Sequence, residues 1–177
     1  ESSLGITPVS YVTMGEGPPL LLVHGLGGSW RNWLENIPHL AESHTVYAID
    51  LPGFGLSPNP QGPITIAGFG QVVNDFADRL GLGVETALIG HSMGGFIATE
   101  SVITEPGRFS SLTLVSAAGI SFAGMKRADK TAREVLLRVG LPIFERRVEA
   151  NLGRKRLRAA SFAGVIAHPS RISRAIL

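Results

Sequence analysis

The chain has 177 residues, of which 44% are hydrophobic and 17% charged, and it contains no cysteine. This length and composition predict one globular domain, or one domain and the start of a second, and they exclude an intrinsically disordered chain, disulfides and a cysteine nucleophile. The lack of cysteine suits a reducing compartment, so we expect a cytoplasmic protein, and no apolar run reaches the roughly 18 residues of a membrane span.

The net charge of +2 is unevenly distributed along the chain. Residues 121–177 contain 13 lysines and arginines but only four acidic residues, a net charge of +9, whereas residues 1–120 have a net charge of −7. A basic segment can bind nucleic acid. Because these basic residues are spaced among apolar ones, we interpret them as helix faces that meet an acidic partner segment, and we expect no nucleic-acid partner.

Short apolar runs alternate with helical patterns through the first 120 residues. Residues 9–14 alternate in polarity and end at Gly15-Glu16-Gly17-Pro18, which is typical of an edge strand followed by a turn. The other expected strands are apolar on both faces, as in a buried parallel sheet. They are residues 20–23, 45–49, 86–89 and 112–115, and the expected helices are residues 30–41, 67–81 and 93–105. This order predicts an α/β fold with a mostly parallel sheet and helices on both faces.

The pattern changes after Gly119. Residues 126–139, 142–152 and 155–167 have amphipathic helical patterns with no strand between them. We therefore expect two parts, an N-terminal part of an α/β core in residues 1–120 and an incomplete helical cap in residues 121–177.

The strongest functional signal is Gly90-His91-Ser92-Met93-Gly94, which lies between a predicted strand and a predicted helix. A G-x-S-x-G motif in this context is typical of a nucleophile elbow, where the serine sits on a strained turn with its hydroxyl exposed. Gly90 and Gly94 are expected to leave room for the neighbouring strand and helix. A glycine-rich turn that binds phosphate, or nothing, is the alternative interpretation.

A second glycine-rich loop, His24-Gly25-Leu26-Gly27-Gly28, follows the strand predicted at residues 20–23. Gly25 and Gly27 would let the backbone approach a substrate, so we expect the N–H groups of Leu26 and Met93 to form an oxyanion hole. A dinucleotide-binding turn would need glycine at position 30, where the chain has Trp30. A phosphate-binding loop at residues 119–124 would need lysine at position 125, where the chain has Met125.

A third loop, residues 50–57 (DLPGFGLS), follows the strand predicted at residues 45–49. Ligand sites of parallel sheets form where strands end, so the three loops are expected to converge. Trp30 and Trp33 lie three residues apart on one predicted helix face and are expected in the core. We also expect Phe54 and Phe96 to pack in a loop and in the core, respectively.

HGLGG, DLPGFGLS and GHSMGG, in this order and at these spacings, resemble the α/β-hydrolase superfamily and, within it, bacterial esterases and carbon–carbon bond hydrolases. The resemblance covers residues 8–120. It implies that a serine attacks a carbonyl, that a histidine takes the proton and that an Asp or Glu orients the histidine. The dehalogenase and epoxide hydrolase branches have aspartate at the elbow, so Ser92 argues against both.

The chain departs from this family in one respect. The family order is Ser, acid, His, with the last two after the cap. Only His168 follows Ser92, and its surroundings are helical, which argues against a role as the base. We therefore expect the triad acid and base to be absent from this chain, whose isolated form would then be aggregation-prone or need a complementary C-terminal segment or a second copy.

These observations predict a serine hydrolase that cleaves a small-molecule carboxylic ester through an acyl-enzyme at Ser92, with no metal or organic cofactor. Carbon–carbon bond hydrolysis of ring-cleavage products and cofactor-free perhydrolysis are alternatives on the same scaffold. An alternative of another class is a non-catalytic fragment or subunit that lacks the triad acid and base.

Overall fold

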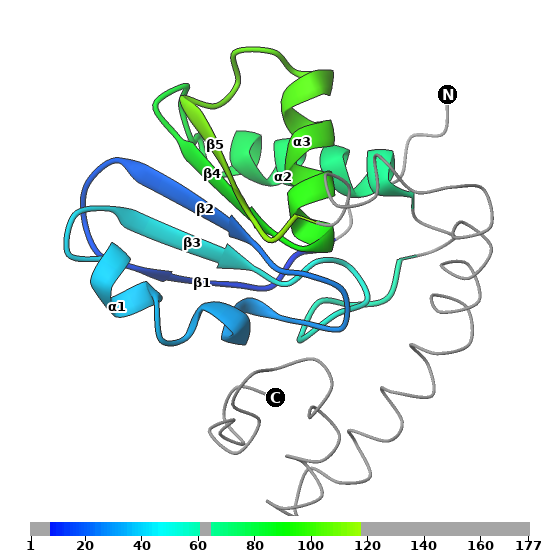
Figure 1. Cartoon of the computed structure of the whole chain (residues 1–177), viewed down its shortest axis with the longest axis horizontal. Helices are drawn as coiled ribbons and strands as arrows, with labels where there is room; N and C mark the ends of the chain where they lie inside the picture. Colours follow the sequence, from blue (N-terminus) through cyan, green and yellow to red (C-terminus); the bar gives the residue numbers. More distant parts are fainter. Residues whose placement is uncertain (1–7, 61–64, 118–177) are drawn as a thin grey trace, which may run out of the picture. The chain divides into compact units, whose positions relative to one another are not determined.

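The computed structural model describes residues 8–60 and 65–117 (Figure 1). The helices expected in residues 121–177, and His168, lie outside this part. The described residues form a five-stranded sheet in the order β1-β3-β2-β4-β5. The strands are β1 (Tyr11–Met14), β2 (Pro19–Val23), β3 (Thr45–Ile49), β4 (Ala87–His91) and β5 (Ser111–Val115).

The sheet is mostly parallel, as predicted. Strand β2 pairs in parallel with β3 and β4, and β5 extends the sheet in parallel beyond β4. Only β1 runs antiparallel, against the outer edge of β3. Because β2, β3 and β4 point the same way, their carboxyl ends lie at one edge of the sheet, where the arrowheads meet in Figure 1.

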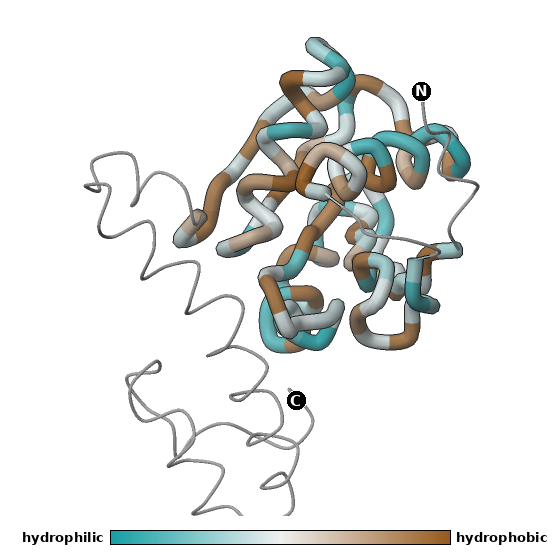
Figure 2. The backbone as a smooth tube through the Cα atoms, turned by 90° about the vertical axis from the view of Figure 1, so that its right-hand side faces the viewer, coloured by the Kyte–Doolittle hydropathy of each residue, from teal (hydrophilic) through white to brown (hydrophobic). Residues whose placement is uncertain are grey.

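Both faces of the sheet are covered, because successive residues of a strand point to opposite sides. On one face, Leu20 and Leu22 pack with Trp33 of the 3₁₀ helix η1 (Trp30–Trp33) and with α1 (Ile37–Leu40). On the other face, Leu21 and Val23 pack with α2 (Ile66–Arg79) and α3 (Met93–Thr104). Figure 2 shows brown hydrophobic and teal hydrophilic stretches alternating along the described part of the chain.

The prediction of a single helix over residues 30–41 is wrong. The segment forms η1 and the one-turn helix α1 instead, because Pro38 lies in the first turn of α1, where its missing N–H costs nothing, and could not continue a helix from η1. Ser29 begins η1, since its hydroxyl accepts the Arg31 N–H at 3.3 Å. The prediction that the two tryptophans belong to the core is confirmed, since Trp33 is buried and Trp30 packs on the same cluster.

Helices α2 and α3 lie against each other on the second face. Thr65 begins α2 by accepting the Gly68 N–H at 3.0 Å. The two helices are joined by a buried polar pair, in which the Ser101 hydroxyl donates to Asn74 Oδ1 and Asn74 Nδ2 donates to the Ser101 carbonyl at 3.2 Å.

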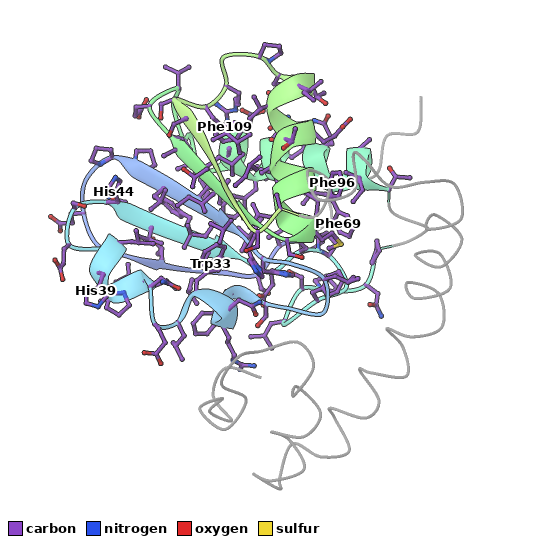
Figure 3. All side chains as sticks on the ribbon, viewed as in Figure 1. Trp33, His39, His44, Phe69, Phe96 and Phe109 are labelled. Carbon is purple, nitrogen blue, oxygen red and sulfur yellow. The ribbon has the colours of Figure 1, made fainter. Side chains whose placement is uncertain are left out.

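Phe96 is not a core residue, so that prediction is wrong. Its side chain is 39% exposed, because the buried face of α3 is formed by Ile97, Ala98 and Ser101, which leaves position 96 on the outer side (Figure 3). In residues 8–60 and 65–117, none of the helices combines the length and the hydrophobicity that a membrane crossing requires.

Candidate active site

The three loops singled out in the sequence leave the sheet at the same edge. Residues 24–28 follow β2, residues 50–57 follow β3, and Ser92 follows β4. The carboxyl ends of these parallel strands are neighbours in the sheet, so the loops converge at one place, as ligand-binding loops of parallel sheets do.

Ser92 forms the bend between the last residue of β4 and the first residue of α3. Its φ of 53° and ψ of −117° lie where non-glycine residues are rarely found. The bend is fixed on both sides, since the Ser92 N–H donates to the Val115 carbonyl and the Gly95 N–H donates to the Ser92 carbonyl, both at 3.0 Å. The Ser92 hydroxyl does not cap α3, and the residue is partly exposed.

The two glycines of the elbow motif have no space for a side chain. A Cβ on Gly90 would collide with the backbone of Gly94, and a Cβ on Gly94 would collide with the carbonyl oxygens of Val23 and His24. The G-x-S-x-G spacing therefore has a steric cause. It lets α3 start directly above β4 and beside the end of β2.

The loop after β2 touches the elbow through Gly25. A Cβ on Gly25 would lie 3.0 Å from Cβ of Ser92 and 3.2 Å from Nδ1 of His91. The loop then turns tightly, since the Gly28 N–H donates to the Gly25 carbonyl at 3.1 Å and Gly27 has a φ of 68° that favours glycine.

The N–H groups of Leu26 and Met93 are both unused within the described part of the chain. The Met93 N–H belongs to the first turn of α3, where N–H groups have no partner within the helix and the helix dipole favours negative charge. Leu26 lies in the loop after β2, which contacts Ser92 through Gly25, and is 39% exposed. Two free donors on two elements that meet at Ser92 are what an oxyanion requires.

His24 connects the loops after β2 and β3. Its Nδ1 hydrogen-bonds the Gly25 carbonyl at 2.7 Å and its Nε2 accepts the Leu51 N–H at 3.0 Å. Both ring nitrogens are therefore occupied, and the bond from Leu51 requires the neutral ring. Burial lowers the pKa of His24, in agreement with a neutral ring. Because both nitrogens are engaged, neither is free to take the proton of Ser92 while these bonds are kept.

Asp50, the first residue after β3, links the loops in a way that the sequence analysis did not assign to it. Its buried carboxylate accepts the Trp30 N–H at 2.6 Å and the Leu56 N–H at 2.9 Å. Its carbonyl accepts the Ser57 hydroxyl at 2.6 Å. The available signal was an acidic residue that directly follows an apolar strand and begins a glycine-rich loop.

The other described histidines are not hydrogen-bonded to the Ser92 hydroxyl. His91 is half-buried and lies edge-on to Trp33 with 6.3 Å between ring centroids, and burial lowers its pKa. His39 and His44 precede β3, so they lie at the amino end of that strand, opposite the edge where Ser92 lies (Figure 3). In residues 8–60 and 65–117, no group of three or more His, Asp or Glu side chains is placed to hold a metal ion.

The family of the chain follows from comparison with known proteins. The model of the alpha/beta hydrolase fold family matches residues 18–158, and the chain belongs to this family. It is 40% identical over 117 residues to the dihydrolipoyllysine-residue acetyltransferase component of the acetoin cleaving system of Cupriavidus necator, a match that covers 65% of the chain and 31% of the relative.

Two further matches are hydrolases by name. The human (lyso)-N-acylphosphatidylethanolamine lipase is 37% identical over 101 residues, which is 55% of the chain and 29% of the lipase. The crystal structure of a membrane phospholipase A, described as a bacterial virulence factor, superimposes with a TM-score of 0.60 and 38% identity over 63% of the chain and 36% of that protein. The matched part of the chain thus corresponds to about a third of the length of these relatives.

Proposed function

We propose that the chain is a serine hydrolase that cleaves a carboxylic ester through Ser92. The Ser92 oxygen attacks the ester carbonyl, its proton passes to a histidine base, and the alcohol leaves with a proton to give an acyl-enzyme that water hydrolyses. The observation that carries this proposal is the backbone of Ser92, whose φ of 53° raises the residue on a strained bend between β4 and α3.

The oxyanion of each tetrahedral intermediate is held by the N–H groups of Leu26 and Met93. Both are free of other partners in the described part, and Gly25 brings the Leu26 loop against Ser92. Loss of one such donor typically costs about 10² to 10³-fold in turnover.

The base and its orienting acid come from outside the described residues. His24 has both nitrogens engaged, and the half-buried His91 makes no hydrogen bond to the Ser92 hydroxyl. His39 and His44 lie at the other edge of the sheet. We propose that another segment, in this polypeptide or in a partner chain, supplies a histidine and a carboxylate to Ser92.

The substrate is an ester with an apolar acyl group. Three large apolar side chains are exposed on the elements that meet at Ser92, namely Leu26 at 39%, Leu56 at 73% and Phe96 at 39%. Each of them belongs to a loop or helix that starts at this edge of the sheet, and exposed apolar side chains favour apolar ligands. The names of the lipase and the phospholipase A among the relatives agree with ester cleavage.

A fluorophosphonate probe tests this function, because it reacts covalently with an activated serine. We expect the probe to label the chain and the label to disappear in Ser92→Ala. Ser43→Ala is the matched control, because Ser43 is an exposed serine before β3, and it should label like the wild type. No labelling, even with a complementing C-terminal segment of a relative added, would contradict the proposal.

A non-catalytic subunit is the second candidate. Two observations favour it: the described residues place no histidine on Ser92, and a relative is named as a component of a larger system. The same labelling experiment separates the candidates, since only the hydrolase reacts at Ser92.

A further inference from the structure

We infer that Asp50 is a positioning residue that holds the oxyanion donor Leu26 beside Ser92, an inference that rests on the proposed function. The carboxylate is fully buried, and in the described part of the chain no arginine or lysine is paired with it. Burying an unpaired carboxylate costs several kcal/mol unless hydrogen bonds replace its hydration. Its hydrogen bonds therefore decide what Asp50 does.

These hydrogen bonds tie two loops together. Oδ1 of Asp50 accepts the N–H of Trp30, the residue that ends the loop after β2, at 2.6 Å. Oδ2 accepts the N–H of Leu56, in the loop after β3, at 2.9 Å. The second loop wraps around the carboxylate so closely that a Cβ on Gly55 would collide with it. One side chain thus hydrogen-bonds the backbone of both loops at once.

Leu26 lies between two fixed points of its loop. At one end, Gly25 rests against Ser92, and His24 accepts the Leu51 N–H. At the other end, Trp30 is held by Asp50. Between these points the loop has one internal backbone hydrogen bond, from Gly28 to Gly25, so the position of the Leu26 N–H depends on both ends.

The chemistry makes this position important. An oxyanion donor acts only at hydrogen-bonding distance from the developing charge. A displacement of about 1 Å in a reacting geometry can cost about 100-fold in rate. A residue that never touches substrate can therefore control the rate through the loop.

Asp50→Asn tests the inference, because asparagine keeps the shape but places an NH₂ group where one of the two N–H donors must bind. We expect the rate at which fluorophosphonate labels Ser92, normalised to the number of folded sites, to fall by about 10- to 100-fold. Hydrogen exchange of the Trp30 and Gly28 amides should accelerate in the same variant, because both report the loop directly.

Ser101→Ala is the matched control. It removes a buried polar contact, the one between α3 and α2, and does not touch the three loops. A purely structural role of Asp50 would lower stability and the fraction of labelled protein in both variants but leave the labelling rate of the folded sites unchanged. Equal rates in the two variants, or unchanged exchange at Gly28, would overturn the inference.

A second pair of variants covers the case in which Asp50→Asn does not fold. Trp30→Pro deletes the donor N–H at the first position of η1, where proline is tolerated, and it also removes the indole ring. Trp30→Ala removes the ring but keeps the N–H, so the difference between the two variants isolates the hydrogen bond. The proline variant should label more slowly than the alanine variant, and equal rates would overturn the inference. If the wild type is not labelled at all, the proposed function fails, whereas the exchange of Gly28 still decides whether Asp50 holds the loop.

Discussion

Ser92 occupies a backbone conformation that a non-glycine residue adopts only when its surroundings impose it. Such a conformation costs about 1 to 3 kcal/mol. Here the Val115 carbonyl and the Gly95 N–H hold the residue from both sides, and the glycines at positions 90 and 94 admit the close approach of α3. These contacts offset the backbone strain and keep the Ser92 hydroxyl at the end of β4.

The buried ring of His24 predicts how stability depends on pH. Burial lowers the pKa of His24 below 6.5 in the folded chain, so below pH 6.5 the unfolded chain binds more protons than the folded one. The contribution of His24 to the free energy of unfolding should therefore be fully present above pH 6.5. The free energy of unfolding should fall as the pH drops from there toward the folded pKa, by up to about 1.4 kcal/mol per pH unit. His91, whose pKa is also lowered, acts in the same direction.

Denaturant unfolding at several pH values on both sides of 6.5 measures this dependence. His39→Gln is the control, because it removes a histidine whose side chain is 83% exposed rather than buried. A free energy of unfolding that stays constant or rises as the pH falls would contradict the neutral, hydrogen-bonded His24.

At the scale of elements, the elbow depends on how closely α3 approaches β2. Gly94→Ala should destabilise the fold by more than about 2 kcal/mol, because the new Cβ would collide with the carbonyl oxygens of Val23 and His24, and overpacking of this kind outweighs the better helix propensity of alanine. Gly107→Ala is the control, since its space is open and only its φ of 83° is strained, at a cost of about 1 kcal/mol. Thermal unfolding compares the two, and an equal loss would show that α3 does not sit so close to β2.

Most elements of this fold could be predicted from local sequence patterns. The expected strands agree with the observed ones to within two residues at each end, because a buried strand is an uninterrupted apolar run. The helix over residues 30–41 was wrong because Pro38 starts a new helix. Phe96 was misplaced because an elbow helix with a mostly apolar sequence has no clear polar face from which its orientation could be deduced.

The loops of the candidate site were predictable only in part. The elbow motif is local, so its residues stand together in the sequence. The contacts of Asp50 with Trp30 and of His24 with Leu51 join residues 20 and 27 positions apart, and no periodicity indicates which distant N–H a buried side chain will accept. Side chains that link loops are therefore the part of the site that needs coordinates.

At the scale of the whole described core, the sheet is a middle layer between two hydrophobic clusters. Leu21 and Leu22 are both fully buried, yet they are neighbours in β2 and so point to opposite faces. Leu21 packs with the α2 and α3 side, and Leu22 packs with the η1 and α1 side. Covering both faces buries residues 20–23 of the central strand, and only its first residue, Pro19, is partly exposed.

This layering predicts that the two leucines are equally important. Leu21→Ala and Leu22→Ala should each lower the free energy of unfolding by about 2 to 5 kcal/mol, the usual cost of a cavity in a packed core. Leu114→Ala is the matched control, because Leu114 lies on β5 and is 36% exposed, and its replacement should cost less. Denaturant unfolding measures all three. If either Leu21→Ala or Leu22→Ala costs no more than Leu114→Ala, the face on which that leucine lies is not packed. For Leu22 this would mean that the short helices η1 and α1 are too loosely held to keep Trp30 against Asp50.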